Sequence, residues 1–351
     1  MIMNEYEIFC SGVAPRLYPT YTIYGLLWYD KNHALEIPKR YPYSGEWGQI
    51  TATQILNRDK TPIPSRLSLM WYSVVEKKVY DIDLFIPINK IEDFWRKNDI
   101  EPNKTISHIV VGMAPYGDVA VWINSLYKSV VISWEKGQEV ELDNELLLFE
   151  PIANCLIDGD SYLKEHPFVQ NNLKTCGFPH ENLYRKYMQQ FTYRYQPLFE
   201  KWDDGEEVEW QKYKEDELSP EFEYIEEYLF DGTFNKLHDN GLLKYHKAGK
   251  PKKLAIKWHI KKSEYTAYFW FEDEKICSIF ERFYGAHPDT KTDFIIRIDA
   301  EKKKYELALY RQGLKEPQII SEDAYQLLVF KNKFEDYRSD NYNQDRGAWI
   351  W

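Results

Sequence analysis

The sequence predicts an α+β protein built from two β-rich lobes with antiparallel sheets and one packed helix each, joined by a helical connector. Three observations predict this fold. Strand-forming runs alternate with turn residues in the first and last thirds of the chain, apolar residues recur at helical spacing between them, and the last third repeats the plan of the first. The expected domains are residues 1–157, 158–230 and 231–351.

The first third of the chain has the pattern of a strand-and-turn lobe with one helix. Residues 21–29 and 67–75 are rich in residues that favour strands. A helix is expected after Pro87, because apolar residues recur on one face between Ile88 and Trp95. Three further short strands are expected at residues 108–111, 119–123 and 130–134, where intervening glycines favour tight antiparallel connections.

Two helices are expected in the connector. The first begins near Leu183, where aromatic and apolar residues recur at i, i+3, i+4 and i+7, and Pro197 ends or kinks it. The second begins at Ser219 as N-cap with Pro220 in the first turn. Its apolar stripe is expected to consist of Phe222, Ile225 and Leu229.

An internal repeat relates the two β-rich lobes. Trp71 and Trp258 each end a similar strand segment, and the helix after Pro87 is echoed by apolar residues at helical spacing in 276–283. The match pairs residues 108–111 with 293–296 and 119–122 with 307–310, so that Trp122 corresponds to Tyr310. The alternative interpretation is a coincidence between two β-rich regions.

Composition restricts the classes of function. The chain has 351 residues, 17% of them aromatic, and a formal charge of −11. Aromatic side chains with polar edges suit strands and interfaces. Nucleic-acid binding is disfavoured because it requires clustered Lys and Arg.

The acidic bias is concentrated in residues 203–227, which hold twelve acidic residues and two lysines, together with interleaved aromatic residues. This composition is typical of a surface that steers and docks a basic protein partner. The alternative is a solvated face. Residues 244–262 are rich in lysine. They either offset the acidic segment or solvate an edge strand, or they form a patch that binds phosphate or nucleic acid. The expected partner-binding residues are Trp202, Asp203, Asp204, Glu206, Glu207, Glu209, Trp210, Glu215, Asp216 and Glu217.

No catalytic or metal-binding motif is evident. The four cysteines have no C-x-x-C spacing, the eight histidines have no H-x-x-x-H spacing, and no nucleophile elbow or P-loop occurs. We therefore expect no enzymatic activity, no cofactor and no metal. The N-terminal residues lack the pattern of a signal peptide, which predicts a cytoplasmic chain, or a periplasmic lipoprotein if a leader was removed.

Several segments carry a family resemblance. They are Trp71-Tyr72-Ser73, Glu76 with Tyr80, Pro87 with Lys90-Ile91, residues 112–122 and Tyr193-Arg194-Tyr195 with Phe199-Glu200. In this order they resemble the bacterial domain-of-unknown-function family numbered 2931, over roughly the first 200 residues. Members are often lipoproteins, and many look like immunity proteins encoded beside type VI secretion effectors. This chain lacks their lipobox.

The resemblance implies a non-enzymatic immunity protein that neutralises a type VI secretion toxin by direct binding. The expected partner is therefore such a toxin, and the acidic segment predicts that its surface is basic. A carbohydrate- or envelope-binding module is the alternative suggested by 12 Trp and 28 Tyr. An enzyme with a dispersed site is the third hypothesis. An exposed aromatic platform would favour the second, and a deep pocket lined by carboxylates with perturbed pKa values would favour the third.

Overall fold

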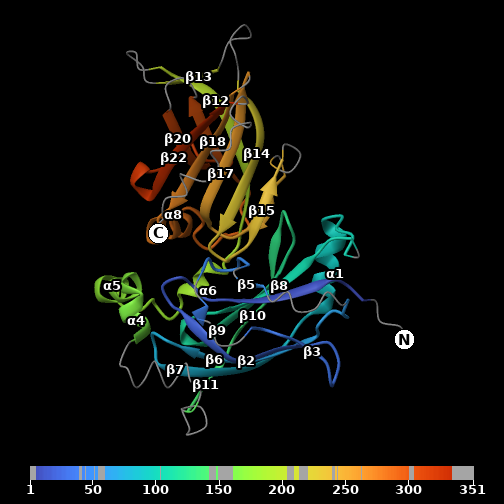
Figure 1. Ribbon diagram of the computed structural model, residues 1–351. Helices are drawn as coiled ribbons and strands as arrows, with labels where there is room; N and C mark the ends of the chain where they lie inside the picture. The colour runs from blue at the N-terminus through green and yellow to red at the C-terminus, as the bar shows by residue number, and fades with distance from the viewer. Residues whose placement is uncertain are drawn as a thin grey trace. The chain divides into compact units, whose positions relative to one another are not determined.

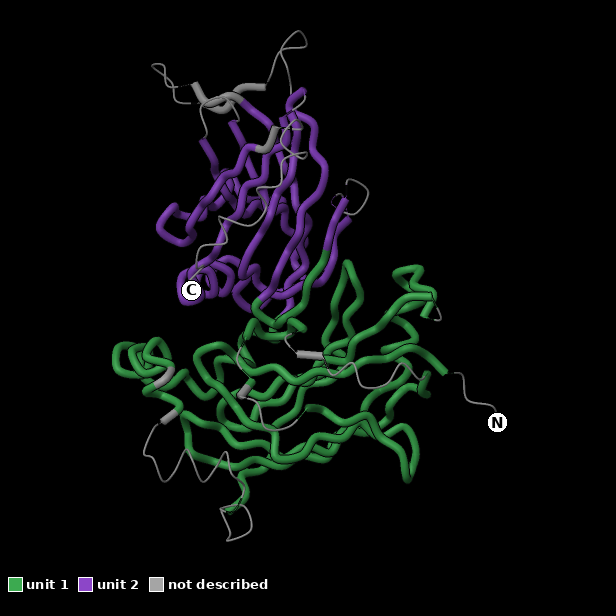
Figure 2. The backbone as a smooth tube through the Cα atoms, viewed as in Figure 1, with its two compact units in different colours: residues 1–189, 230–235 green, residues 190–229, 236–351 purple. Residues whose placement is uncertain are grey.

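The strands and helices fall into two compact units. Unit 1 comprises residues 1–189 and 230–235, and unit 2 comprises residues 190–229 and 236–351 (Figure 2). The computed structural model describes residues 5–38, 42–43, 45–50, 52–53, 60–102, 104–141, 148, 161–203, 209–212, 220–238, 242, 244–261, 263–299 and 304–333. Within these residues strands predominate over helices and nearly all strand pairs are antiparallel, which confirms the β-rich, antiparallel part of the prediction.

Unit 1 consists of two sheets and a helix, α1, that closes the core between them (Figure 1). One sheet has the order β10-β9-β8-β1-β5, and the other has the order β11-β7-β6-β2-β3, with β4 also on β2. The elements are β1 (Ile8–Val13), β2 (Thr20–Trp28), β3 (Ala34–Glu36), β4 (Pro42–Tyr43), β5 (Ala52–Thr53), β6 (Arg66–Ser73), β7 (Lys78–Phe85), α1 (Ile88–Lys97), β8 (Ser107–Met113), β9 (Asp118–Asn124), β10 (Ser129–Lys136) and β11 (Gln138–Val140).

The core of unit 1 explains why these segments form strands and a helix. Alternate residues of the strands point inward from both sheets, as the side-chain period of two requires. Trp71 is fully buried and stacks on Tyr80, its cross-strand neighbour, with ring centroids 5.4 Å apart. Helix α1 buries Phe94 and Trp95, and the Trp95 indole N–H donates to the Ser107 hydroxyl at 3.0 Å.

Three short helices follow in unit 1. They are α4 (Ser161–Glu165), α5 (Pro167–Cys176) and α6 (Leu183–Tyr187). The helix predicted from Leu183 is therefore real but short, because a strand begins at Phe191 and Pro197 lies inside that strand, opposite Ile296. Within its described residues, the predicted connector of residues 158–230 is helical only between residues 161 and 187 and forms strands from Phe191 onward.

Unit 2 is also built on two sheets and a helix, α8. Its sheets have the orders β13-β12-β19-β20-β21, with β16 also on β12, and β15-β14-β17-β18-β22. The elements are β12 (Phe191–Asp203), β13 (Glu209–Lys212), β14 (Glu221–Leu229), β15 (Phe234–Leu237), β16 (His246–Ala248), β17 (Pro251–Ile260), β18 (Ser263–Phe271), α8 (Asp273–Tyr284), β19 (Thr292–Asp299), β20 (Lys304–Tyr310), β21 (Gln318–Ile320) and β22 (Tyr325–Lys333).

The two units share one strand order. The order β10-β9-β8-β1-β5 of unit 1 matches β21-β20-β19-β12-β16, and the order β11-β7-β6-β2-β3 matches β22-β18-β17-β14-β15. Even the parallel pair β1 with β8 has its counterpart in β12 with β19. Trp258 stacks on its cross-strand neighbour Tyr265 as Trp71 does on Tyr80, with centroids 5.6 Å apart. The pattern of pairing therefore supports a duplicated fold.

One part of the predicted repeat is displaced. Val121 pairs with Val111 in unit 1, and Leu307 pairs with Ile296, the counterpart of Val111, in unit 2. Val121 thus corresponds to Leu307 rather than to Leu309. Asn124, not Trp122, is the counterpart of Tyr310, so the predicted match of Trp122 with Tyr310 is wrong by two residues.

The helix predicted after Ser219 is also wrong, because residues 221–229 form strand β14. The inward positions of β14 are Ile225, Glu227 and Leu229, which are buried at a spacing of two. A carboxylate at the middle inward position interrupts the apolar alternation that would identify a strand. The remaining apolar residues then mimic a helical stripe.

Candidate functional site

The predicted acidic docking segment includes a β-hairpin formed by the end of β12 and by β13. Trp202 pairs with Trp210, and Asp203 pairs with Glu209. Pairing of β12 with β19 ends at Phe199, so the hairpin continues beyond the end of that parallel pair (Figure 1). The structure brings these four predicted residues together. The other six, Asp204, Glu206, Glu207, Glu215, Asp216 and Glu217, lie outside the described residues.

The acidic residues of β14 face basic partners within unit 2. Glu221 Oε2 lies 2.8 Å from His259 Nε2, and Glu223 Oε2 lies 3.4 Å from Lys257 Nζ. Both basic residues are on β17, the neighbouring antiparallel strand. This confirms the interpretation that the lysine-rich stretch offsets part of the acidic segment. Glu221 and Glu223 are thus engaged within unit 2.

A buried polar cluster lies in the core of unit 2. Glu227 is fully buried; its Oε2 accepts a hydrogen bond from the Tyr195 hydroxyl at 2.8 Å, and its Oε1 lies 3.4 Å from His246 Nε2. Burial raises the pKa of Tyr195 well above its usual value, so the phenol stays protonated and keeps donating. The pairing registers place Glu227 where unit 1 has Leu27, and Tyr195 where unit 1 has Cys10.

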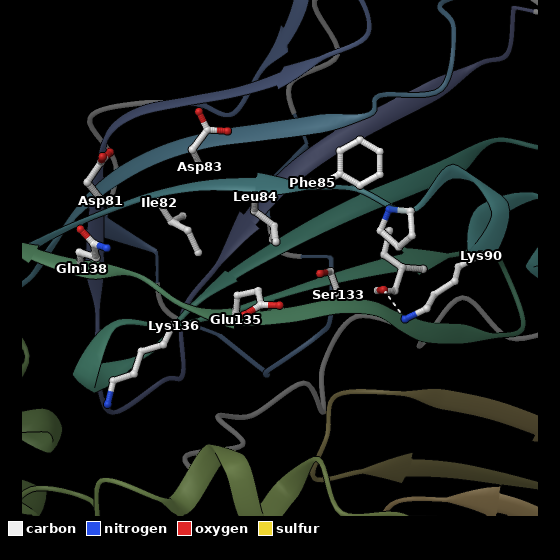
Figure 3. A pocket seen from close by; sticks show the side chains of 12 residues that line it. Asp81, Ile82, Asp83, Leu84, Phe85, Lys90, Ser133, Glu135, Lys136 and Gln138 are labelled. Carbon is white, nitrogen blue, oxygen red and sulfur yellow. Dashed lines mark hydrogen bonds between the residues drawn. The ribbon is translucent and has the colours of Figure 1, made fainter.

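A groove of about 690 Å³ lies in unit 1 between β7 and β10 (Figure 3). This volume falls within the roughly 300–1,000 Å³ typical of ligand sites. Ile82 and Leu84 contribute apolar side chains from β7, and Ile132 contributes one from β10. Phe85 stands at the groove with 73% of its surface exposed. An exposed ring beside apolar walls is a feature of binding surfaces.

Four charged residues of the groove, Asp81, Asp83, Lys90 and Lys136, are engaged in ion pairs or hydrogen bonds. Asp83 pairs with Arg66, which lowers the pKa of the Asp83 carboxyl. A general acid needs a raised pKa instead. Asp81 accepts from the Tyr24 hydroxyl at 2.6 Å, and Lys136 Nζ lies 2.8 Å from Glu181 Oε1. The lowered pKa of Asp83 makes this residue unsuited to act as a general acid.

Two thiols are protonated and enclosed. Burial raises the pKa of Cys10 and that of Cys277 to about 12, well above the range in which a thiolate nucleophile would form. Within the described part of the chain, no group of three or more His, Cys, Asp or Glu side chains could hold a metal ion. No helix of the described residues is long and apolar enough to cross a membrane.

Reasoning from sequence missed both the groove and the buried cluster. Glu227 was counted as part of the acidic run, although its inward position on a strand separates it from the others. The groove depends on two strands that are far apart in sequence. It also depends on the strand lengths that the structure shows, since β11 is three residues long and its counterpart β22 is nine, so no sequence signal identified it.

The pairing order of the described strands makes this chain a β-rich protein with several antiparallel sheets and few helices. A family model described as a protein of unknown function (DUF2931) matches residues 4–202. This match covers more than half of the chain, and the chain belongs to that family, as its sequence motifs predict. The match includes unit 1 up to residue 189 and continues into β12, the first strand of unit 2. No curated protein and no solved structure matches the chain.

Proposed function

We propose that this chain is a non-enzymatic protein-binding protein, and more specifically an immunity protein that neutralises a bacterial type VI secretion toxin by direct binding. The observation that carries the proposal is the acidic β12–β13 hairpin, where two tryptophan positions pair beside two acidic positions. Aromatic anchors within a field of one charge sign favour fast, specific docking of an oppositely charged partner. Periplasmic and cytoplasmic sites of action are both compatible with this proposal.

The sequence also gives this segment a strong negative charge. Residues 203–227 carry almost all of the chain's net charge of −11, and part of that charge is offset by β17. Most of the acidic residues of this segment lie in and directly after the sequence of the hairpin. A toxin with a basic surface is the expected partner, because charge complementarity steers diffusional encounter.

Charge reversal in the hairpin region tests the docking surface. Replacing Glu206, Glu207, Glu215 and Glu217 by Lys should lower the association rate constant for the toxin encoded beside this gene by about tenfold or more at low salt and flatten its salt dependence. The rate constants are measured by biolayer interferometry at several salt concentrations. Reversal of four exposed carboxylates in unit 1 is the control; these are Glu92, Asp99, Glu101 and Glu141. Equal association rates in both variants would reassign the acidic segment to solvation.

A carbohydrate- or envelope-binding module is the second candidate. Tyr268 and Trp270 on β18 stack with centroids 5.4 Å apart, and the Lys253 ammonium lies 4.8 Å from the ring centroid of Tyr228. This ammonium also lies 5.0 Å from the Tyr268 centroid and 5.7 Å from that of Trp270. The chain's own cation thus occupies the environment that a sugar would need. Loss of glycan binding on Trp270→Ala would favour this candidate over a protein binder.

A further inference from the structure

Strand β7 leaves part of one edge uncovered. β11 pairs with β7 only at residues 79–81, so among the described residues 82–85 have no strand partner on that side. Unit 2 provides the comparison. The counterpart of β7 is β18, and β22 pairs with it along its whole length, from Ser263 to Phe271. Among the described residues, the same position in the fold is filled by a strand in unit 2 and has no strand in unit 1.

The backbone of β7 is oriented to accept a strand at this edge. The N–H of Ile86 donates to the carbonyl of Ser65 at 2.8 Å, on the side of β6. Because bonding direction alternates along an antiparallel strand, the N–H and C=O groups of Asp83 and Phe85 point to the opposite edge. That edge is one wall of the groove of about 690 Å³ (Figure 3).

The opposite wall is less suited to strand pairing. β10 carries a bulge between Val131 and Ser133, which disturbs the regular ladder. The Lys90 ammonium donates to the Ile132 carbonyl at 2.9 Å, which occupies an acceptor of that edge (Figure 3). Bulges and lysines are the usual protection of strand edges. The protection on β10 leaves β7 as the pairing edge of the groove.

We infer that this groove binds an extended peptide segment of a partner protein, which adds to β7 as an antiparallel strand. Main-chain hydrogen bonds to Asp83 and Phe85 supply affinity, and alternate side chains of the peptide enter the groove. The occupant is a peptide of four or more residues with apolar side chains at every second position. Those side chains pack on Ile82, Leu84 and Ile132.

Unit 2 indicates the side chains that suit this position. Ala267 and Phe269 are the counterparts of Ile82 and Leu84, and β22 places Val329 and Leu327 opposite them. The strand that fills the equivalent edge therefore presents apolar residues at a spacing of two. The same spacing is expected in a peptide that fills the open edge of β7.

The groove belongs to unit 1 and the acidic hairpin to unit 2, so the two surfaces are tested separately. A library of random dodecapeptides displayed on phage is panned against the full chain, and the enriched peptides are synthesised and titrated. Their sites are mapped by ¹⁵N amide shifts. Charge reversal in the acidic hairpin should leave peptide affinity unchanged, which distinguishes this inference from the proposed toxin binding.

Changes to the peptide and to the protein test whether the peptide binds through the backbone of β7. N-methylation of the two peptide amides that face β7 should weaken binding by at least about tenfold, the effect of losing two typical backbone hydrogen bonds.

Phe85→Pro removes a backbone donor of β7 and should weaken binding similarly, whereas Phe85→Ala keeps that donor and should stay within about threefold. Ser133→Trp, which fills the groove from β10, should abolish binding without altering β7.

Several results would overturn the inference. These are no enrichment of alternating apolar peptides, amide shifts outside residues 82–85 and 132–136, or equal affinity for the N-methylated peptides. Self-association of the free protein that is lost in Phe85→Pro would assign the edge to a second copy of this chain instead. Unchanged circular dichroism of each variant verifies that the fold is intact.

Discussion

Glu227 is the single residue that most clearly separates unit 2 from unit 1. It occupies the core position that Leu27 holds in unit 1, and it is fully buried. A buried carboxylate is costly unless donors surround it, and the Tyr195 hydroxyl supplies one donor at 2.8 Å. In unit 2 the hydrogen bond between Tyr195 and Glu227 therefore takes the place of an apolar contact in unit 1. Each of the two buried polar groups needs the other as its hydrogen-bond partner.

A double-mutant cycle tests this dependence. Glu227→Leu should lower the free energy of unfolding by about 1–3 kcal/mol, because the buried Tyr195 hydroxyl loses its acceptor. Adding Tyr195→Phe should recover part of that loss, since both polar partners are then gone. Urea unfolding followed by near-UV circular dichroism gives the four values. Strictly additive effects would show that the two side chains are energetically independent.

Asp118 predicts a pH dependence of stability in unit 1. Burial raises the pKa of this carboxyl to about 6, against about 3.9 in an unfolded chain. The folded state then binds the proton more tightly, so the stabilising contribution is complete below pH ~4 and is lost as pH rises through ~6. Up to about 3 kcal/mol of unfolding free energy should be lost over this interval.

Asp118→Asn should remove that slope. The free energies of unfolding of the wild type and the variant are measured at steps of half a pH unit between pH 4 and pH 7. The difference between the two values should be smaller at pH 4 than at pH 7. The variant is expected to be the more stable protein at neutral pH, because no carboxylate is buried there. Parallel pH profiles for the wild type and the variant would exclude Asp118 as the titrating group.

At the scale of elements, regular amphipathic patterns were predictable and interrupted ones were not. The helix after Pro87 and the strand containing Trp71 were found because their apolar residues keep one period throughout. Strand β14 was mistaken for a helix because Glu227 interrupts its inward face. The predicted match of β9 with β20 was displaced by two residues, because side chains alternate along a strand with a period of two and a shift of two residues leaves the inward and outward faces unchanged.

The turn between β8 and β9 depends on Gly117. This residue has φ of +80°, and a Cβ there would lie 2.8 Å from the carbonyl oxygen of Gly137. Gly117→Ala should therefore cost about 2–3 kcal/mol of unfolding free energy, combining backbone strain with a clash. Gly177 is the matched control, with φ of +73° and nothing within 4 Å of a Cβ, and its Ala variant should cost about 1 kcal/mol. Equal losses at both positions would contradict the role of the Gly137 contact.

At the scale of the whole molecule, duplication explains both what was predictable and what was not. The aromatic anchors Trp71 and Trp258 revealed a repeated plan because they hold equivalent places in two sheets. The groove could not be predicted, since it arises from the lengths of β11 and β22 and from the approach of β7 to β10. The surfaces proposed for binding were found where the two units differ in structure, and no sequence motif points to them.

The most direct test of the proposed function is complex formation with a type VI secretion toxin, which that function predicts to be encoded beside this gene. If the chain is the immunity protein of this toxin, co-expression of the full chain should restore growth of cells that produce the toxin, and the two proteins should elute together in size-exclusion chromatography with a dissociation constant in the nanomolar range. Growth arrest despite expression of the full chain, together with separate elution of the two proteins, would show that the chain does not neutralise this toxin.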